Sequence, residues 1–321
     1  KIRVEGEGAL DFLQTICTAQ INIPIGRIVY TQMLNNKGGI ESDLTVSRLG
    51  EKSFLLVVPC ATLQRDLSYL NRENNSDKVI IIDTSSAEGV LSIMGPNSRK
   101  LLEAVSPNNF SNLSHPFGTW KNIEIGSGLA RAHRVSYVGE LGWEIYISSD
   151  QCAHVFEEIW KLQKEFNFNM CGIHALDSCR IEKAYRHFGH DITDEDHVVD
   201  AGLCFTADLS KTYFKGKEAI LKKRKIGSSK KMLQFKLNDP TKMIYHNEPI
   251  IRENKIVGYL TSGNYGHTLG GCVGLGYVDC KDLPNEEILS FEYKVDVAGE
   301  IVPAKTSLRS MYDPRSERVR M

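Results

Sequence analysis

Polar and apolar positions alternate along much of residues 1–60, which predicts strands arranged around a short helix. Residues 27–34 and 43–49 alternate on either side of the turn sequence NNKGG, so we expect them to pair as a β-hairpin. Residues 8–16 carry apolar side chains at helical spacing instead, and residues 61–70 repeat that pattern. This part of the chain therefore predicts a small sheet with helices packed on it.

Strands and helices then follow one another up to residue 187 without regular βαβ spacing, which favours an α+β fold over a doubly wound sheet. We expect an amphipathic helix over residues 150–166, capped by Asp150, and a second helix from Ile173 to His187. The other elements expected here are strands at 78–83, 89–95, 120–125 and 129–137 and a helix at 96–105.

The last third of the chain has a different pattern. From Met232 onward, short strands with turns every 8–12 residues predict a small all-β barrel or sandwich. The basic run at residues 221–231 is typical of a solvated linker between this region and the preceding one. We therefore divide the chain into an α+β region at 1–225, built from two interleaved lobes, and a β-barrel lobe at 226–321.

Composition narrows the class of protein. With 321 residues the chain can form two or three domains, and its net charge of -1 argues against a nucleic-acid binder. No apolar run approaches the roughly 18 residues of a membrane span. Eight scattered cysteines favour reduced thiols inside a cell, with Cys17, Cys60 and Cys204 expected to be buried. The first residue is Lys1, within a strand already under way and without a visible signal peptide, so we expect the N-terminus to be truncated.

Asp43 is the first candidate for chemistry. Alternation places it on the face of Glu41 and Thr45, opposite Leu44 and Val46. A carboxylate among apolar strand neighbours is costly unless it is paired, hydrated or facing a cavity. The pattern is compatible with an outward-facing strand acid and with an acid that lines a ligand channel.

Glu144 is the second candidate, in the sequence YVGELGWEIY at residues 137–146. Its side chain falls on the face opposite Trp143 and Ile145. A carboxylate there can accept two parallel hydrogen bonds from an amidine-like edge, such as that of a 2-amino-4-oxopterin. A surface hairpin explains the same pattern.

Residues 172–191 form the third constellation. Arg180, Lys183 and His187 would share a helical face that either lines an anionic site or is solvated. His187, His190 and Asp191 have a spacing that a metal could use, but such residues are more often caps or hydrogen-bonding groups, so we expect no metal site.

Taken in order, several sequence stretches resemble the glycine-cleavage T-protein (aminomethyltransferase) family over almost the whole chain. They are GGIESDLTV at 38–46, YVGELGWEIY at 137–146, ALDSCRIEKAYRHFGHD at 175–191, DAGLCF at 200–205, FKGKEAI at 214–220 and TSGNYGHTLGGCVGLGYV at 261–278. The sequences GELGWEIY at 139–146, RIEKAYRHFGHD at 180–191 and the closing YDPRSERVRM are most similar to the folate-binding C-terminal half of dimethylglycine and sarcosine dehydrogenases. T-proteins proper usually read GYTGEDG and carry a doubled aspartate where this chain has Ser42 and Asp43.

The resemblance implies a three-lobed disc around a central folate funnel, with a barrel-like C-terminal lobe. By motif position, the family's catalytic aspartate matches Asp43 and its pterin-recognising glutamate matches Glu144. Its turn tyrosine matches Tyr137, and a helix arginine that assists binding matches Arg180. Asp43 would polarise a folate nitrogen and stabilise a cationic donor.

The resemblance also implies an enzyme that transfers a one-carbon unit from an N-methyl amine donor to tetrahydrofolate, giving 5,10-methylenetetrahydrofolate. We expect the chain to be the transferase part of a dimethylglycine or sarcosine dehydrogenase-like oxidoreductase, with FAD present only if a flavin domain lies upstream of Lys1. The alternatives are a stand-alone T-protein or folate-dependent demethylase, and a non-catalytic folate-binding regulatory module. The expected partners are small molecules, the folate and the amine-derived donor, and no nucleic acid or membrane. The expected compartment is the cytoplasm, or the mitochondrial matrix in a eukaryote.

Overall fold

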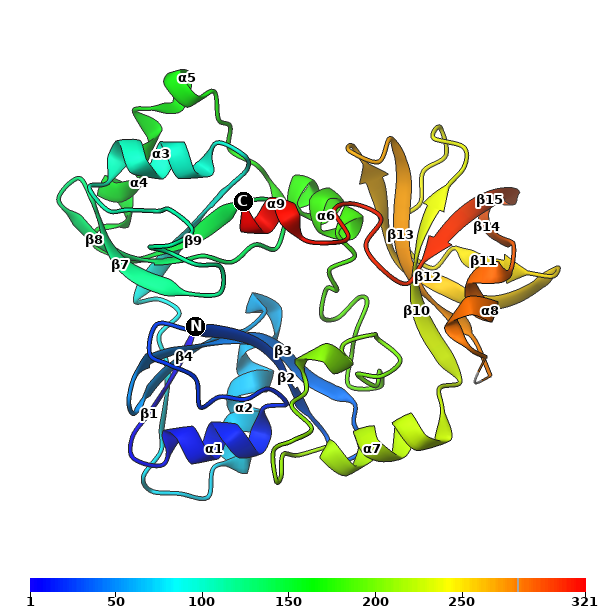
Figure 1. The fold of residues 1–321 in the computed structure, drawn as a ribbon, viewed down its shortest axis with the longest axis horizontal. Helices are drawn as coiled ribbons and strands as arrows, with labels where there is room; N and C mark the ends of the chain where they lie inside the picture. Colours follow the sequence, from blue (N-terminus) through cyan, green and yellow to red (C-terminus); the bar gives the residue numbers. More distant parts are fainter. Residues whose placement is uncertain (282) are drawn as a thin grey trace.

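The structure is a computed structural model that describes residues 1–281 and 283–321. Within these residues the strands form three separate β-structures, which Figure 1 shows as three lobes around the middle of the molecule. Helices lie on the first two β-structures, and the third is a closed barrel. The expected α+β, three-lobed fold with a C-terminal barrel is confirmed.

The first lobe is a mixed unit of sheet and helices with strand order β2-β3-β4-β1-β5. Its strands are β1 (Ile2–Glu5), β2 (Ile28–Leu34), β3 (Ile40–Gly50), β4 (Ser53–Val57) and β5 (Ile80–Asp83). Its helices are α1 (Ala9–Ile16), the short 3-10 helix η1 (Cys60–Thr62) and α2 (Leu63–Glu73). Strands β2 and β3 pair antiparallel, as the hairpin pattern predicted.

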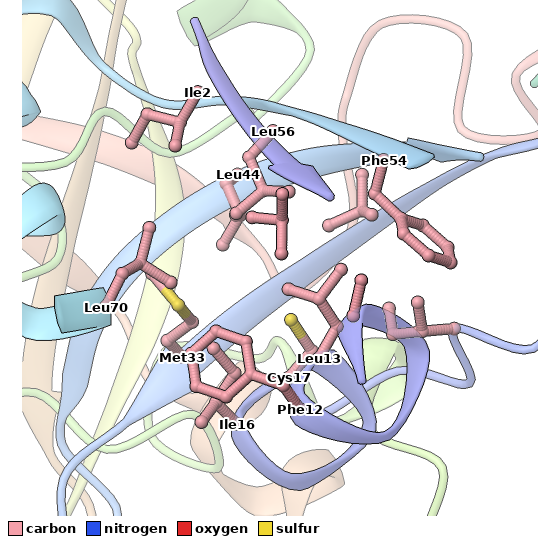
Figure 2. Close-up of a cluster of buried hydrophobic side chains, with 14 of the residues drawn as sticks. Ile2, Phe12, Leu13, Ile16, Cys17, Met33, Leu44, Phe54, Leu56 and Leu70 are labelled. Atoms are coloured by element: carbon pink, nitrogen blue, oxygen red, sulfur yellow. The ribbon is translucent and has the colours of Figure 1, made fainter. Parts of the chain in front are cut away.

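The hydrophobic core of this lobe determines which way Asp43 faces. Leu44 and Val46 of β3 are buried in a cluster with side chains of α1 and α2. Figure 2 shows Leu44 and Met33 gathered in this cluster with Leu13 of α1. Because successive strand residues point to opposite faces, Asp43 lies on the face away from this core.

The second lobe is an antiparallel sheet with strand order β6-β9-β8-β7. Its strands are β6 (Glu88–Met94), β7 (Trp120–Ile125), β8 (Gly128–His133) and β9 (Gly142–Ser148). The helices that follow its strands are α3 (Ser98–Val105), α4 (Cys152–Trp160) and α5 (Gln163–Phe166).

The third lobe is the closed barrel β10-β13-β12-β11-β14-β15. Its strands are β10 (Lys230–Leu237), β11 (Pro249–Arg252), β12 (Lys255–Gly266), β13 (Gly271–Asp279), β14 (Tyr293–Val297) and β15 (Glu300–Ser307). The short helices of this region are α8 (Asn285–Ser290) and α9 (Glu317–Arg320). Between the second lobe and the barrel lie α6 (Ile173–Glu182), η2 (Cys204–Thr206) and α7 (Lys217–Ile226).

Main-chain hydrogen bonds join the first two lobes. The amide of Ile28 donates to the carbonyl of Gly118, and the amide of Trp120 donates to the carbonyl of Gly26. A separate hydrophobic cluster joins the β2–β3 hairpin to the barrel, with Ile40 and Leu275 among its buried members. The three lobes are therefore packed against one another near the hairpin that carries Asp43.

Several local predictions were wrong. The helix expected over residues 150–166 is interrupted between Trp160 and Gln163, and Asp150 does not cap it. Helix α6 ends at Glu182, because Ala184 adopts a left-handed backbone with φ of 54° that cannot continue a helix.

The basic run expected to be a linker is largely helical, since α7 continues to Ile226 and ends at Gly227, whose φ is 99°. Of the three cysteines expected to be buried, Cys17 is buried, whereas Cys60 is exposed and Cys204 is half-buried. No helix in the described part of the chain has the length and apolar character needed to cross a membrane.

Candidate active site

Asp43 lies on β3 directly opposite Gln32 of β2. The Gln32 amide donates from Nε2 to Asp43 Oδ1 at 2.8 Å. The hydroxyl of Tyr30, two residues away on the same face of β2, also donates to this carboxylate. Asp43 is half-buried, and two donors from the neighbouring strand hold it in place.

Burial is the main influence on the Asp43 carboxyl group and raises its pKa to about 6. The hydrogen bonds from Gln32 and Tyr30 and the positive charge of Arg186 lower the pKa, but they do not outweigh desolvation. Burial and the charge of Asp43 raise the pKa of Tyr30 well above its usual value, so Tyr30 stays protonated and remains a donor. The site thus holds an acid that titrates close to neutral pH.

Tyr137 lies in the same neighbourhood. Its hydroxyl donates to the carbonyl of Arg186 at 2.8 Å, and its ring stacks on Tyr185 with centroids 6.1 Å apart. Burial raises the pKa of Tyr137, and the charges of Arg180 and Asp43 both act on it. Tyr137 therefore lies between the surroundings of Asp43 and those of Arg180.

Glu144 lies on β9 and pairs across the sheet with His133 of β8. Tyr146 donates from its hydroxyl to Glu144 Oε2 at 2.7 Å, and its ring packs on His133 with centroids 4.2 Å apart. Burial raises the pKa of Glu144, which the Tyr146 hydrogen bond partly offsets. Burial lowers the pKa of His133 to about 3, so this imidazole is neutral at physiological pH. Among the described residues, its Nε2 atom is buried without a hydrogen-bond partner.

The surroundings of Asp43 and Glu144 meet through Ser47 of β3. Ser47 Oγ lies 3.5 Å from His133 Nδ1. Ser47 and Asp43 are on the same face of β3, four residues or about 13 Å apart. The face of β3 that carries Asp43 thus meets the sheet that carries Glu144 through the contact between Ser47 and His133.

Arg180 is buried and paired. Its Nε donates to Asp177 at 2.7 Å, and its Nη1 donates to Asp191 at 2.5 Å. Nη1 also lies 3.2 Å from Ser262 of β12. In this structure Arg180 joins α6 to the barrel, and the binding role that the resemblance implies for it stays a prediction.

The helical face expected for Arg180, Lys183 and His187 does not form, because α6 ends at Glu182. Lys183 pairs with Asp313, and His187 packs on His190. The described residues contain no group of three or more acidic, histidine or cysteine side chains placed to hold a metal ion.

The sequence reasoning missed the residues that contact the two acids. Gln32 and Tyr30 surround Asp43, while His133 and Tyr146 surround Glu144. The hairpin register, had it been fixed, would have placed Gln32 opposite Asp43, because polar residues on facing strands share a side of the sheet. A signal for His133 was absent, since its strand register to β9 cannot be read from alternation alone.

Comparison with known protein families gives matches over most of the chain. Residues 1–211 match the model described as the GCVT N-terminal domain. Residues 230–313 match the model described as the glycine cleavage T-protein C-terminal barrel domain. Helix α7 lies between the two matched segments.

Three relatives show the range of related proteins. A "4-methylaminobutanoate oxidase (formaldehyde-forming)" of Paenarthrobacter nicotinovorans is 38% identical over 100% of this chain, which spans 38% of that protein. An "Aminomethyltransferase" of Halothermothrix orenii is 34% identical over 94% of this chain and 84% of its own length. The mitochondrial "Sarcosine dehydrogenase" of Homo sapiens is 32% identical over 94% of this chain and 35% of its own length. The chain thus spans less than two fifths of the oxidase and the dehydrogenase.

A solved structure has the same fold. The glycine cleavage system aminomethyltransferase T from Bartonella henselae superposes with a TM-score of 0.85 at 24% identity, covering 98% of this chain and 84% of that one.

Proposed function

This chain belongs to the glycine-cleavage T-protein family, and from that premise we propose that it transfers a one-carbon unit from an amine donor to tetrahydrofolate. The observation that carries the proposal is that the strand face carrying Asp43 contacts, through Ser47, the His133 side chain whose strand pairs with that of Glu144. The surroundings of Glu144 suit recognition of the cofactor, and those of Asp43 suit catalysis.

Glu144 has the surroundings of a cofactor-recognising carboxylate. Tyr146 holds Glu144 Oε2, so the orientation of the carboxylate is fixed before any ligand binds. The unpartnered Nε2 of His133, on the neighbouring strand, adds a buried polar atom beside Glu144. A carboxylate and a neutral imidazole suit the amino and ring N–H groups of a pterin edge. We infer that Glu144 and His133 would hold that edge and that Tyr137 would line the site.

Asp43 has the surroundings of a catalytic carboxylate. When bound, tetrahydrofolate supplies the nitrogen atoms that accept the carbon. Asp43, ionised above about pH 6, would accept a hydrogen bond from the reacting nitrogen and stabilise positive charge on the donor. Tyr30 and Gln32 keep that negative charge in one place, which reduces reorganisation during the reaction.

The donor is proposed from the longer relatives. Because the chain matches one part of an oxidase and of a sarcosine dehydrogenase, we propose an imine donor made by flavin oxidation of an N-methyl amine elsewhere in the same protein. FAD belongs to the proposal only through such a domain. The match to an aminomethyltransferase over 84% of its length supports the second candidate, a stand-alone transferase.

Titration of tetrahydrofolate into wild type and Asp43→Asn tests the catalytic assignment. We expect the variant to bind folate normally and to lose about 100-fold or more of its turnover. Glu41→Gln is the matched control, since Glu41 lies two residues away on the same face and pairs with Arg65. Full turnover in Asp43→Asn would refute the role of Asp43. A wild type that binds folate without turnover would identify a binding module.

The binding assignment is tested with Glu144→Gln. Loss of the charge should weaken folate binding by about tenfold or more, because hydrogen bonds to charged groups are the stronger ones. Glu124→Gln, an exposed acid on β7 of the same sheet, is the control and should leave the dissociation constant unchanged. The mass and visible absorbance of the native protein distinguish a transferase joined to a flavin domain from a stand-alone transferase, since a bound flavin absorbs visible light.

A further inference from the structure

Gln32 is a fully buried amide next to Asp43. Its side chain lies on β2, opposite Asp43, and its Nε2 donates to Asp43 Oδ1 at 2.8 Å. A buried amide is costly unless both of its ends are hydrogen-bonded. The other end of Gln32 therefore determines how firmly this contact is held.

The Oε1 atom of Gln32 accepts a hydrogen bond from the hydroxyl of Thr206 on η2. That hydroxyl also lies 2.8 Å from the carbonyl of Leu203, which has the amide of Thr206 as a second donor, whereas Thr206 is the one donor to Gln32 Oε1 among the hydrogen bonds of the described residues. The hydroxyl hydrogen is thus available to Gln32. Since an ionised carboxylate can only accept, the amide has one orientation that satisfies both neighbours.

The short helix η2 supports both donors to Asp43. Thr206 holds Gln32, and the ring of Phe205 packs beside Tyr30 with centroids 6.4 Å apart. Phe205 itself is 77% exposed, so its contact with Tyr30 is a contact at the surface of the site. One segment far along the chain therefore supports two residues of β2.

We propose that Gln32, held in one orientation by Thr206, is the positioning residue that fixes the direction and charge of the Asp43 carboxylate. The inference deepens the proposed function and rests on it for the consequence in catalysis. The hydrogen bonds from Thr206 to Gln32 and from Gln32 to Asp43 are present in the protein without folate. The titratable and charged groups that act on Asp43 are Tyr30 of β2 and Arg186 and Tyr137 of the adjoining segments.

The direct test measures the Asp43 carboxyl group by carbon NMR titration in the free protein, with Asp43→Asn assigning the signal. Gln32→Met keeps the volume and removes the donor, so the Asp43 pKa should rise by about one pH unit or more. Thr206→Val should raise it by a smaller amount, because the amide loses its anchor. Thr206→Ser keeps the hydroxyl and should retain the wild-type pKa.

The double variant Gln32→Met/Thr206→Val shows whether Thr206 acts through Gln32. If it does, Thr206→Val adds no further shift once the amide is gone. Additive shifts would overturn this part of the proposal. If Gln32→Met does not fold, the Asp43 pKa in Thr206→Val and Thr206→Ser still tests the proposal, because these variants change few atoms.

Kinetics give the second readout. Gln32→Met should lower kcat about fivefold at pH 6 with little change in KM for folate, and kcat should recover toward the wild-type value at pH 8. Recovery at high pH separates a shifted acid from general structural damage. Gln234→Met is the control, since Gln234 is an equally buried strand amide that bonds to Ile181 and Glu182 in another lobe. It should lower stability without moving the pH profile.

An unchanged Asp43 pKa in Gln32→Met would overturn the inference, whatever the activity. Absence of folate turnover in wild type, with the pKa shift present, would refute the proposed function and leave the positioning of Asp43 intact. The two failures are therefore distinguishable.

Discussion

Folding disfavours the ionised form of the Asp43 carboxyl group. Its pKa of about 6 in the folded protein compares with an ordinary value of 3.8, and burial is the main cause. The folded protein therefore binds this proton more tightly than the unfolded chain does. The stability contributed by the protonated acid is fully present below about pH 4 and is lost as pH rises through 6.

Asp43→Asn should consequently stabilise the protein at pH 7.5 by about 2 kcal/mol, because the uncharged amide avoids the cost of burying an ionised acid. At pH 4 the gain should disappear. Urea denaturation of both proteins at the two pH values measures it. Equal stability at pH 7.5 would mean that Gln32, Tyr30 and Arg186 fully compensate the buried charge.

The strand faces of Asp43 and Glu144 could be predicted from the sequence, but the residues that contact them could not. Alternation placed Asp43 and Glu144 on the correct strand faces, because the period of a strand fixes the face of each side chain. It could not supply the partners. Thr206 reaches Gln32 across 174 positions, and such a contact depends on how distant segments pack.

At the scale of elements, the β2–β3 hairpin is pressed against the segment that follows α6. The amide of Ile40 donates to the carbonyl of Asp196, and Gly39 pairs with His197. A Cβ atom on Gly39 would lie 1.9 Å from the carbonyl oxygen of Asp194. The turn that leads into the strand of Asp43 thus requires a residue without a side chain at position 39.

Gly39→Ala should destabilise the protein by about 3 kcal/mol, since backbone must move to admit the methyl group. The same shift should disturb the strand that carries Asp43 and lower turnover. Gly172→Ala is the matched control, because nothing lies within 4 Å of a Cβ at that position. Thermal denaturation and turnover measure both effects, and equal melting temperatures for the two variants would contradict the expected clash.

Elements with a clear alternation or helical spacing of apolar residues were predicted from the sequence. The ends of helices that depend on tertiary contacts were not. The hairpin, α1 and the barrel strands follow from alternation and turn residues. Helix α6 stops early although its sequence could continue as helix. Its last residue, Glu182, accepts the amide of Leu269 in the barrel region, and Ala184 turns the chain away. Charge alone suggested a linker at 221–231, where the pattern in fact continues a helix.

At the scale of the whole molecule, the segment after the barrel returns to the second lobe, as Figure 1 shows for α9. Tyr312 donates to Glu140 of the turn before β9. Lys183, at the end of α6, pairs with Asp313 at 2.9 Å, and both side chains are buried. This segment therefore connects the barrel, α6 and the second sheet.

Asp313→Asn should destabilise this connection by about 3 kcal/mol, because it leaves the Lys183 ammonium buried without its counter-charge. Hydrogen exchange of residues 310–321 should become much faster. Glu317→Gln is the control in the same segment, since Glu317 and Arg315 are exposed and such pairs contribute little. Slow exchange preserved in Asp313→Asn would show that other contacts hold the segment.

The main-chain hydrogen bonds between residues 26–28 and 118–120 have a consequence for how this family diversifies. They join the sheets that carry Asp43 and Glu144 through main-chain atoms, so this contact does not depend on side-chain identity. If the chain acts as proposed, side chains that contact the donor can be replaced without changing the spacing of Asp43 and Glu144. Donor preference would then differ between members by substitution of side chains on an unchanged backbone frame.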